Sequence, residues 1–212
     1  MFSGIVESKA QILSAKWEGG LVAIEVGRPP SFDDLRIGDS VCTNGVCLTV
    51  DLLQSDRVRF VLGHETLQVT KWTAEGLQGQ WVNLERSLKW SDRVHGHMVS
   101  GHVDGLGLVQ KVTYQEGSLI IDIQPPQALL SYIWQKGSWA VNGVSLTVNS
   151  IHAGTVSVCL IPETQRRTQL SDLKAGDHVN LEIDMMARGM VQFMEQAAQS
   201  GRLTEWLRLA EK

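Results

Sequence analysis

Short runs of hydrophobic residues, with polar residues at alternate positions, follow one another along most of the chain. Examples are LVAIEV at 21–26, VCLTVDLL at 46–53 and VRFVL at 58–62, and turn-forming residues such as EGG at 18–20 separate them. Alternation with a period of two is typical of strands that bury one face. Short strands at this spacing favour an antiparallel barrel or sandwich, in which closure removes exposed edges. The pattern therefore predicts a mainly β fold.

The sequence contains an internal repeat, in which similar stretches occur twice. The stretch NGVCLTV at 44–50 returns as NGVSLTV at 142–148, ninety-eight residues later, with six of the seven residues unchanged. Three further pairs follow in the same order: MFSGIVES at 1–8 with MVSGHVDG at 98–105, ETLQVT at 65–70 with ETQRRT at 163–168, and VNLE at 82–85 with VNLE at 179–182. Because the offset changes by only one residue, each copy is a complete unit. We expect one barrel at 1–90 and a second, similar barrel at 91–184.

An Asn-Gly dipeptide opens the central stretch of each copy, as Asn44-Gly45 and as Asn142-Gly143. Such dipeptides reach the positive φ angles of a two-residue hairpin turn. Each is therefore predicted to join two antiparallel strands at the same place in its barrel.

Beyond residue 184 the period of the hydrophobic pattern lengthens to three or four residues. The apolar residues at these steps are Met186, Met190, Phe193, Met194 and Ala197. They predict an amphipathic helix that stops at Ser200-Gly201, within a helical segment at 185–212. The same rhythm continues at Leu203, Trp206, Leu207 and Ala210 and predicts a second short helix. The apolar face needs a surface to cover, and the sequence leaves open whether that surface is another copy of the chain or its own barrels.

Charge and cysteine content narrow the classes of function. The formal net charge is −4 at pH 7 and no run of Lys or Arg stands out, so a nucleic-acid partner has little support. The chain lacks a stretch of eighteen apolar residues that would suggest a membrane span, and its N-terminus lacks the pattern of a signal peptide. Cys42, Cys47 and Cys159 form neither a disulfide frame nor a metal-binding spacing, which predicts a reduced, cytoplasmic location.

The two copies differ where reactive side chains are expected. The aligned pairs that differ are Cys47 and Ser145, Ile5 and His102, Phe2 and Val99, and Gly38 and Lys136. Two similar pockets with unequal chemistry predict one type of substrate used in two roles, as donor and as acceptor.

Six stretches of the sequence resemble those of a known enzyme family. They are MFSGIVE at 1–7, NGVCLTV at 44–50, SGHVDG at 100–105, KGSWAVNGVSLTV at 136–148, LIPET at 160–164 and VNLEID at 179–184. In this order they make the chain similar to riboflavin synthase of the alpha-chain type. The resemblance implies two six-stranded antiparallel Greek-key barrels plus a C-terminal α-helix that holds a homotrimer together. It also implies a site between the N-terminal barrel of one subunit and the C-terminal barrel of its neighbour.

The activity that the resemblance implies is a dismutation. Two molecules of 6,7-dimethyl-8-ribityllumazine exchange a four-carbon unit and give riboflavin and 5-amino-6-ribitylamino-uracil, the last step of riboflavin biosynthesis, without an outside cofactor. A base must remove a proton from the C7 methyl group of one lumazine, and a nucleophile must add to C7 of the other. The sequence leaves open which barrel binds the donor and whether the enzyme associates with lumazine synthase.

The resemblance assigns the chemistry to seven residues, which are Phe2, Ser40, Cys47, His102, Lys136, Ser145 and Asp184. A histidine such as His102 is suited to proton transfer near neutral pH. Purely structural roles for Cys47 and His102 stay open, because an isolated Cys on a strand is ordinarily a small buried hydrophobe and a lone His is ordinarily structural. Whether Cys47 attacks the substrate or positions a water also stays open.

The matching segments of the two copies are expected to form the walls of the substrate pockets. The residues expected to bind substrate are Gly4, Ile5, Val6, Cys47, Leu48, Thr49, Val61, Leu62, Gly63, His64, Glu65, Thr66, Gly101, His102, Val103, Lys136, Ser145, Leu146, Thr147, Ile161, Pro162, Glu163, Thr164, Gln165 and Arg166. Thr49 follows Cys47 by two residues and so faces the same side of its strand, as Thr147 does after Ser145. Backbone groups of these walls can pair with the pyrimidine edge of the lumazine, and threonine hydroxyls can bind its ribityl chain.

Three other interpretations are weaker. A metal site could be suggested by the three nearby histidines, His95, His97 and His102. They match no recognised ligand spacing, however, and the resemblance implies no metal. A lumazine protein, which binds one lumazine or flavin without turnover, shares the duplicated barrel, yet both copies here keep their reactive residues. The flavin-binding barrel of a reductase would need a nucleotide-binding partner domain, for which the chain is too short.

Overall fold

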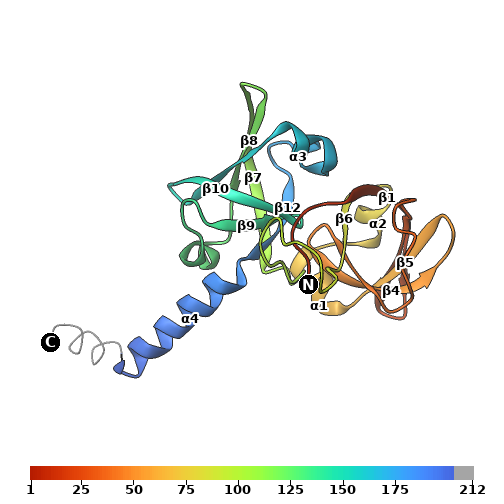
Figure 1. The fold of residues 1–212 in the computed structure, drawn as a ribbon, viewed down its shortest axis with the longest axis horizontal. Coiled ribbons are helices and arrows are strands. Elements are labelled where there is room, and N and C mark those ends of the chain that lie inside the picture. The colour runs from red at the N-terminus through yellow and green to blue at the C-terminus, as the bar shows by residue number, and fades with distance from the viewer. Residues whose placement is uncertain (203–212) are drawn as a thin grey trace.

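Residues 1–202 are described by a computed structural model, and their strands close into two β-barrels, one from each copy of the repeat (Figure 1). The first barrel contains β1 (Ser8–Glu18), β2 (Leu21–Gly27), β3 (Ser40–Thr43), β4 (Val46–Leu53), β5 (Arg57–Leu62) and β6 (Trp81–Arg86), hydrogen-bonded in the order β1-β2-β5-β4-β3-β6. The second contains β7 (Gly105–Gln115), β8 (Ser118–Gln124), β9 (Ser138–Val141), β10 (Val144–His152), β11 (Thr155–Leu160) and β12 (His178–Ile183), in the equivalent order β7-β8-β11-β10-β9-β12. Neighbouring strands pair antiparallel throughout both barrels. The predicted pair of six-stranded Greek-key barrels is confirmed.

Short helices fill the same connection in both barrels. Between β5 and β6 lie α1 (His64–Thr70) and α2 (Ala74–Leu77), and between β11 and β12 lie α3 (Pro162–Arg167) and a 3₁₀ turn at Gln169–Asp172. Another 3₁₀ turn, Gln127–Tyr132, precedes β9. The segments expected to form pocket walls at 61–66 and 161–166 therefore lead from a strand into a helix in each copy.

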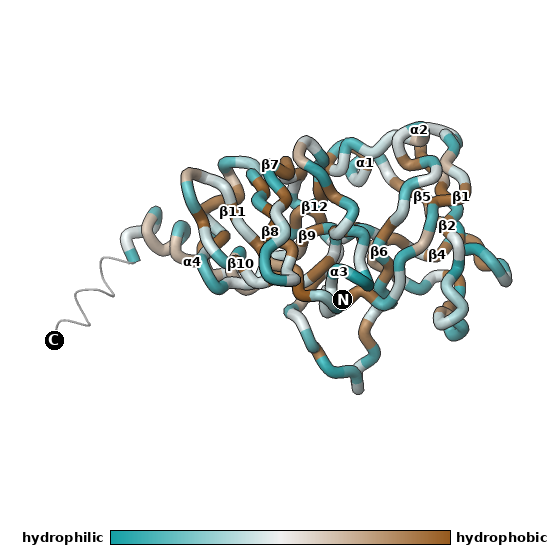
Figure 2. The backbone as a smooth tube through the Cα atoms, turned by 90° about the horizontal axis from the view of Figure 1, so that it is seen from above, coloured by the Kyte–Doolittle hydropathy of each residue, from teal (hydrophilic) through white to brown (hydrophobic). Residues whose placement is uncertain are grey.

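Alternation along the strands separates the barrel cores from their outer faces. On β4, Val46, Leu48 and Val50 are buried in the first core, whereas Cys47 and Thr49 between them lie on the outer face. Figure 2 shows hydrophobic and hydrophilic residues following one another along the strands of both barrels. Burial of such side chains stabilises a fold by about 25 cal/mol for each Å² of apolar surface removed from water. Cys47 and Thr49 thus lie on a strand whose opposite face packs in the core.

The two predicted Asn-Gly hairpin turns are confirmed and meet each other between the barrels. Asn44 and Gly45 have φ angles of 45° and 85°, and Asn142 and Gly143 have φ angles of 46° and 75°. A Cβ atom added to Gly45 would lie 2.8 Å from the backbone nitrogen of Gly143. Only glycine allows the two turns to approach this closely.

Polar and apolar contacts join the barrels around this point. The side-chain amide of Asn83 donates to the carbonyl of Asn142 at 3.0 Å. In the equivalent contact of the other repeat, the side-chain amide of Asn180 donates to the carbonyl of Asn44 at 2.8 Å. A buried apolar cluster lies beside them and contains Phe2, Cys42, Val99 and Ala140. The barrels are therefore related by an approximate two-fold symmetry that matches the sequence repeat.

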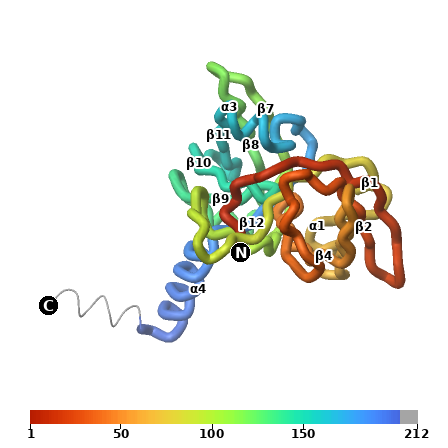
Figure 3. The backbone as a smooth tube through the Cα atoms, turned by 45° about the vertical axis from the view of Figure 1, so that its right-hand side comes forward, coloured from red at the N-terminus to blue at the C-terminus, as the bar shows by residue number. Residues whose placement is uncertain are grey.

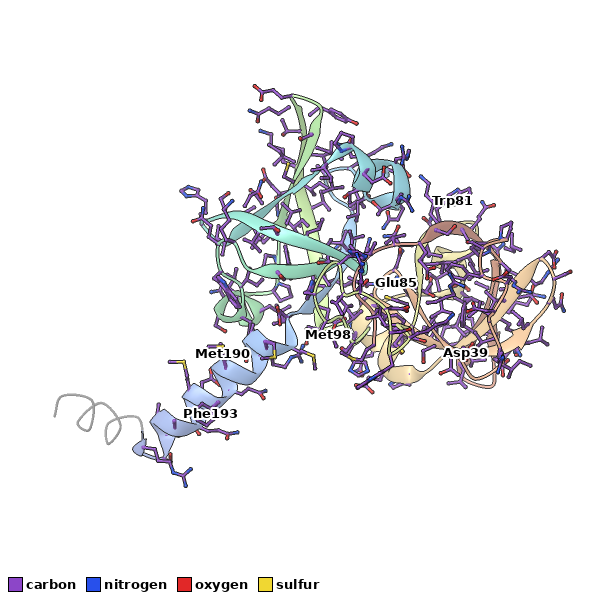
Figure 4. The ribbon with its side chains drawn as sticks, in the orientation of Figure 1. Asp39, Trp81, Glu85, Met98, Met190 and Phe193 are labelled. Atoms are coloured by element: carbon purple, nitrogen blue, oxygen red, sulfur yellow. The ribbon has the colours of Figure 1, made fainter. Side chains whose placement is uncertain are left out.

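The helix α4 (Met185–Gln199) leaves the second barrel and projects away from both (Figures 1 and 4). It begins where the Asp184 side chain accepts a hydrogen bond from Met186 N at 2.8 Å, and Gly201 with a φ of 76° follows its end, as predicted. Met186 and Met190 are more than 60% exposed, so this face does not pack on the barrels of its own chain. The predicted second helix, at 203–210, lies outside the described residues. Within residues 1–202, none of the helices combines the length and the apolar character that crossing a bilayer would require.

Candidate functional site

Two segments of the chain cross from one barrel to the other, and they are named here the crossing arms: residues 1–7 and residues 98–104. Phe2 and Val99 pair as a short antiparallel bridge, in which Phe2 N donates to Val99 O at 2.8 Å and Val99 N donates to Phe2 O at 3.1 Å. Figure 3 shows the red N-terminal segment lying beside the yellow-green segment that precedes the second barrel. The arms therefore lie together between the barrels.

Each crossing arm contacts an expected catalytic residue of the other barrel, Cys47 or Ser145. The carbonyl of Gly101 accepts a hydrogen bond from Cys47 N at 2.9 Å, and the carbonyl of Gly4 accepts one from Ser145 N at 2.8 Å. Gly4 and Gly101 have φ angles of 74° and 81°, in the left-handed region that favours glycine. A Cβ atom on Gly101 would lie 2.6 Å from the Cβ of Cys47. Cys47 and Ser145 are thus each covered by backbone from the opposite repeat.

A cavity of about 380 Å³ opens beside Cys47 and is named here the Cys47 pocket. Its lining consists of Val46, Cys47, Glu65, Thr66, Val69, Thr70, Gly101, His102 and Val103. It combines a thiol, an imidazole, a carboxylate and threonine hydroxyls with valine side chains, and its volume is within the range of small-molecule sites. The structure therefore brings together six residues that were expected from the sequence, which are Cys47, Glu65, Thr66, Gly101, His102 and Val103.

The equivalent position in the second barrel is covered by the linker between the barrels. The Nδ1 atom of His97 lies 2.7 Å from Ser145 Oγ, and His97 N donates to the carbonyl of Ser3 at 3.1 Å. A Cβ atom on Gly96 would lie 2.7 Å from Ser145 Cβ, so the linker backbone rests directly on the serine. The two equivalent positions of the repeat therefore have different surroundings, with Cys47 beside a cavity and Ser145 beside an imidazole.

The His97 imidazole is held in a form suited to accepting a proton. Burial lowers its pKa, and the nearby Asp184 carboxylate opposes this effect. Its Nε2 atom is buried and has no hydrogen-bond partner among residues 1–202. A neutral imidazole with one nitrogen on a serine hydroxyl can act as a general base or orient that hydroxyl.

His97 was not among the catalytic residues expected from the sequence. An offset of ninety-seven places its counterpart before Met1, so comparison of the two copies provides no partner for it. The only available signal was its position in HGHMVSGH, which suggested a metal site. Among the described residues, no three His, Cys, Asp or Glu side chains are grouped so that they could hold a metal ion.

Two buried glutamates hold the crossing arms. Glu85 accepts hydrogen bonds from Ser3 N at 2.6 Å, from Ser3 Oγ at 2.8 Å and from Gly4 N at 3.0 Å. Glu182 accepts the same three from Ser100 N at 2.6 Å, Ser100 Oγ at 2.7 Å and Gly101 N at 2.9 Å. Burial raises the pKa of Glu85 to about 7 and also raises the pKa of Glu182. Both residues belong to the repeated VNLE stretch, but the sequence did not indicate their role.

The remaining catalytic candidates lie outside the Cys47 pocket. Phe2 is fully buried in the cluster between the barrels, and Asp184 caps α4. Lys136 has an exposed side chain and a φ of 69°, and its backbone nitrogen donates to Val148 O. Ser40, paired with Thr49 across β3 and β4, borders a larger hollow of about 930 Å³. In the single chain these residues do not converge on one cavity.

Several expected wall residues direct their side chains elsewhere. Leu48, Leu62 and Leu146 point into the barrel cores, which leaves only their backbone groups for a ligand. Val6 also packs in the second core, whereas Ile5 is exposed beside the larger hollow. Six further wall residues expected in the second copy lie at the N-cap of α3 or within this helix; they are Ile161, Pro162, Glu163, Thr164, Gln165 and Arg166. Within the helix, Glu163 forms ion pairs with Arg166 and Arg167. Gly63 and His64 occupy the equivalent start of α1.

Comparison with known proteins gives matches over nearly the whole chain. The lumazine binding domain family matches twice, at residues 3–87 and 100–184. Riboflavin synthase from Bacillus subtilis (strain 168) is 34% identical over 197 residues, which cover 93% of this chain and 91% of that protein. Riboflavin synthase from Escherichia coli (strain K12) is 38% identical over 199 residues, which cover 92% of each. The crystal structure of LumP complexed with 6,7-dimethyl-8-(1'-D-ribityl) lumazine has a TM-score of 0.76 at 24% identity, covers 86% of this chain and 99% of that chain, and supports the duplicated fold.

Proposed function

The chain belongs to the riboflavin synthase family, and from this premise we propose that it is a transferase that converts two molecules of 6,7-dimethyl-8-ribityllumazine into riboflavin and 5-amino-6-ribitylamino-uracil. The observation that carries the proposal is the unequal pair of sites on one repeated scaffold. Cys47 lies in a pocket with His102, whereas Ser145 lies against His97. One scaffold used twice suits two identical substrates, and the unequal side chains suit their different roles.

The side chains of the two half-sites match the chemical demands of the dismutation. Removal of a proton from the C7 methyl group requires a base, and His102 and His97 each stand beside one reactive residue. Addition to C7 of the second lumazine requires a nucleophile or a positioned water, for which Cys47 and Ser145 are the candidates. Holding the two rings against each other supplies much of the rate enhancement, because it replaces an encounter in solution.

A complete site is proposed to form between neighbouring subunits of a homotrimer. Lys136, Ser145 and Asp184 lie outside the Cys47 pocket of their own chain, so one subunit alone does not bring the two half-sites into a single cavity. The exposed apolar face of α4 offers a contact surface for another copy. In this proposal residues 1–90 and 91–184 form the two lumazine-binding barrels, residues 185–212 assemble the trimer, and the enzyme acts in the cytoplasm.

The test is turnover by the purified protein supplied with dimethyl-ribityllumazine and nothing else. We expect riboflavin to accumulate, followed by its fluorescence and by chromatography, without added nucleotide. Lumazine that stays bound and unchanged after long incubation would overturn the proposed activity in favour of a binding protein. Omission of the protein provides the control for spontaneous dismutation.

A further inference from the structure

Glu182 and Glu85 each bind a crossing arm, and each arm in turn contacts the opposite barrel. Glu182 is a residue of the second barrel and binds the backbone of Ser100 and Gly101, yet the next contact of that segment is with Cys47 of the first barrel. Glu85, which lies between the barrels in Figure 4, belongs to the first barrel and binds Ser3 and Gly4, whose next contact is with Ser145 of the second. A single glycine of the arm therefore connects each carboxylate to the opposite barrel. Gly101 lies between Glu182 and Cys47, and Gly4 lies between Glu85 and Ser145.

We propose that Glu182 is a positioning residue for the Cys47 pocket, and that Glu85 has the same role for Ser145. Glu182 fixes the peptide groups on both sides of Ser100, and through them it places the Gly101 carbonyl on Cys47 N and His102 at the wall of the pocket. The effect on turnover rests on the proposed function, whereas the effect on the geometry around Cys47 does not.

The arm needs such a restraint because glycine has the greatest backbone freedom of any residue. Gly101 adopts a φ of 81° and lies before β7, outside the strands of either barrel. A carboxylate accepts all three N–H and O–H groups at once, and such charge-assisted bonds are roughly twice as strong as neutral ones. An amide at position 182 keeps one acceptor oxygen and turns an N–H₂ group toward the N–H of Ser100 or Gly101. Glu182→Gln is therefore expected to loosen the arm while nearly conserving the volume of the side chain.

Reactivity of the Cys47 thiol reports the position of the arm without reference to lumazine. The three thiols of the chain are distinguishable by peptide mass spectrometry after alkylation with iodoacetamide. Cys42 is buried and burial raises its pKa well above the ordinary value, so it should stay unmodified. Cys159, on β11 of the second barrel, is half-buried and distant in the chain from both arms, and serves as the internal reference.

The experiment compares Glu182→Gln with the matched variant Glu85→Gln in the full-length protein. We expect Cys47 to be alkylated about fivefold faster or more in Glu182→Gln, as a local opening becomes more populated, and by less than about twofold in Glu85→Gln. Cys159 should be alkylated at the wild-type rate in both. Ser100→Ala and Ser3→Ala each remove the hydroxyl bond to the glutamate, and Ser100→Ala also removes the longer bond that Ser100 Oγ accepts from His102 N at 3.3 Å. They form a milder pair with the same expected order, which decides the matter if a glutamine variant does not fold. Equal effects of the two glutamates on Cys47, or no effect of either Glu182 or Ser100, would overturn the proposal.

Turnover separates this proposal from the proposed function. If wild-type protein makes riboflavin, we expect Glu182→Gln to lower kcat/KM by about tenfold or more, as when a positioning contact is lost. If wild-type protein makes none while Cys47 still responds to Glu182 but not to Glu85, the proposed function fails and the positioning role stands. If riboflavin forms and the thiol rates do not respond, the positioning role fails alone.

Discussion

Ser145 Oγ lies 2.7 Å from Nδ1 of His97, and the linker that carries this histidine covers the serine from outside the second barrel. Cys47, the counterpart of Ser145 in the repeat, has a cavity at the same place. The two half-sites therefore share the same backbone arrangement. They differ in whether a cavity opens beside the residue and in the groups nearby that can accept a proton.

His97→Gln is expected to lower kcat by about a hundredfold or more, which is the usual contribution of a general base or of the group that orients it. Because burial lowers the pKa of His97, its imidazole stays neutral down to a pH below the ordinary value of 6.5. Wild-type kcat should therefore fall only as the pH drops through that lowered value, and the variant should lose this acidic limb. His152→Gln, an exposed histidine at the end of β10, is the control and should keep the wild-type rate and pH profile. A wild-type pH profile in His97→Gln would exclude the base role.

Gly101→Ala tests whether the crossing arm must touch Cys47. The added Cβ would lie 2.6 Å from the Cβ of Cys47, and the positive φ adds strain of about 1–2 kcal/mol for a residue with a side chain. Gly117→Ala is a matched control, since Gly117 has a φ of 78° but nothing within 4 Å of the added atom. Both variants should lose unfolding free energy to backbone strain, but only Gly101→Ala should lose lumazine affinity, measured by fluorescence titration. Equal affinities in the two variants would show that the contact is dispensable.

The barrels could be predicted from the sequence because their signals are local and repeated. Alternation along β4 and the Asn44-Gly45 turn describe a strand and a hairpin without reference to distant residues. The same alternation also separates Leu48, whose side chain is in the core, from Cys47, although the family segments placed both in the pocket wall. Strand periodicity was thus a better guide to side-chain direction than the boundaries of a motif.

The parts of the site that could not be predicted depend on contacts between repeats. Glu182 and Cys47 are 135 positions apart in the chain, and their connection passes through an arm whose path no local pattern describes. His97 lies on a linker that has no counterpart in the first copy, so the repeat comparison that identified Cys47 and Ser145 could not identify it. Differences between copies show where chemistry diverges, whereas contacts of the connecting segments appear only in the folded chain.

Glu85 predicts an unusual dependence of stability on pH. Burial raises its pKa from 4.5 to about 7 in the folded protein, so the folded state holds a proton that the unfolded state releases between these values. Its contribution to the free energy of unfolding is fully present below pH 4.5 and is lost as the pH rises through about 7, on the order of 3 kcal/mol in total. Denaturant unfolding of Glu85→Gln should show a flatter dependence than wild type between pH 5 and 7.5. The exposed Glu75→Gln is the control, and an identical slope in wild type and Glu85→Gln would contradict the assignment.

The exposed face of α4 predicts that assembly and activity are lost together. Met190 is 62% exposed in the single chain, and a buried apolar side chain of this size contributes about 1.5–3 kcal/mol to a contact. Met190→Glu is therefore expected to dissociate the proposed homotrimer, as sedimentation velocity would measure, and to abolish riboflavin formation while the circular dichroism of the barrels is unchanged. Gln192→Glu introduces the same charge at an exposed polar position on the opposite side of the helix and should stay assembled and active. A monomeric Met190→Glu protein with wild-type turnover would refute a site shared between subunits, because each chain would then hold both lumazines by itself.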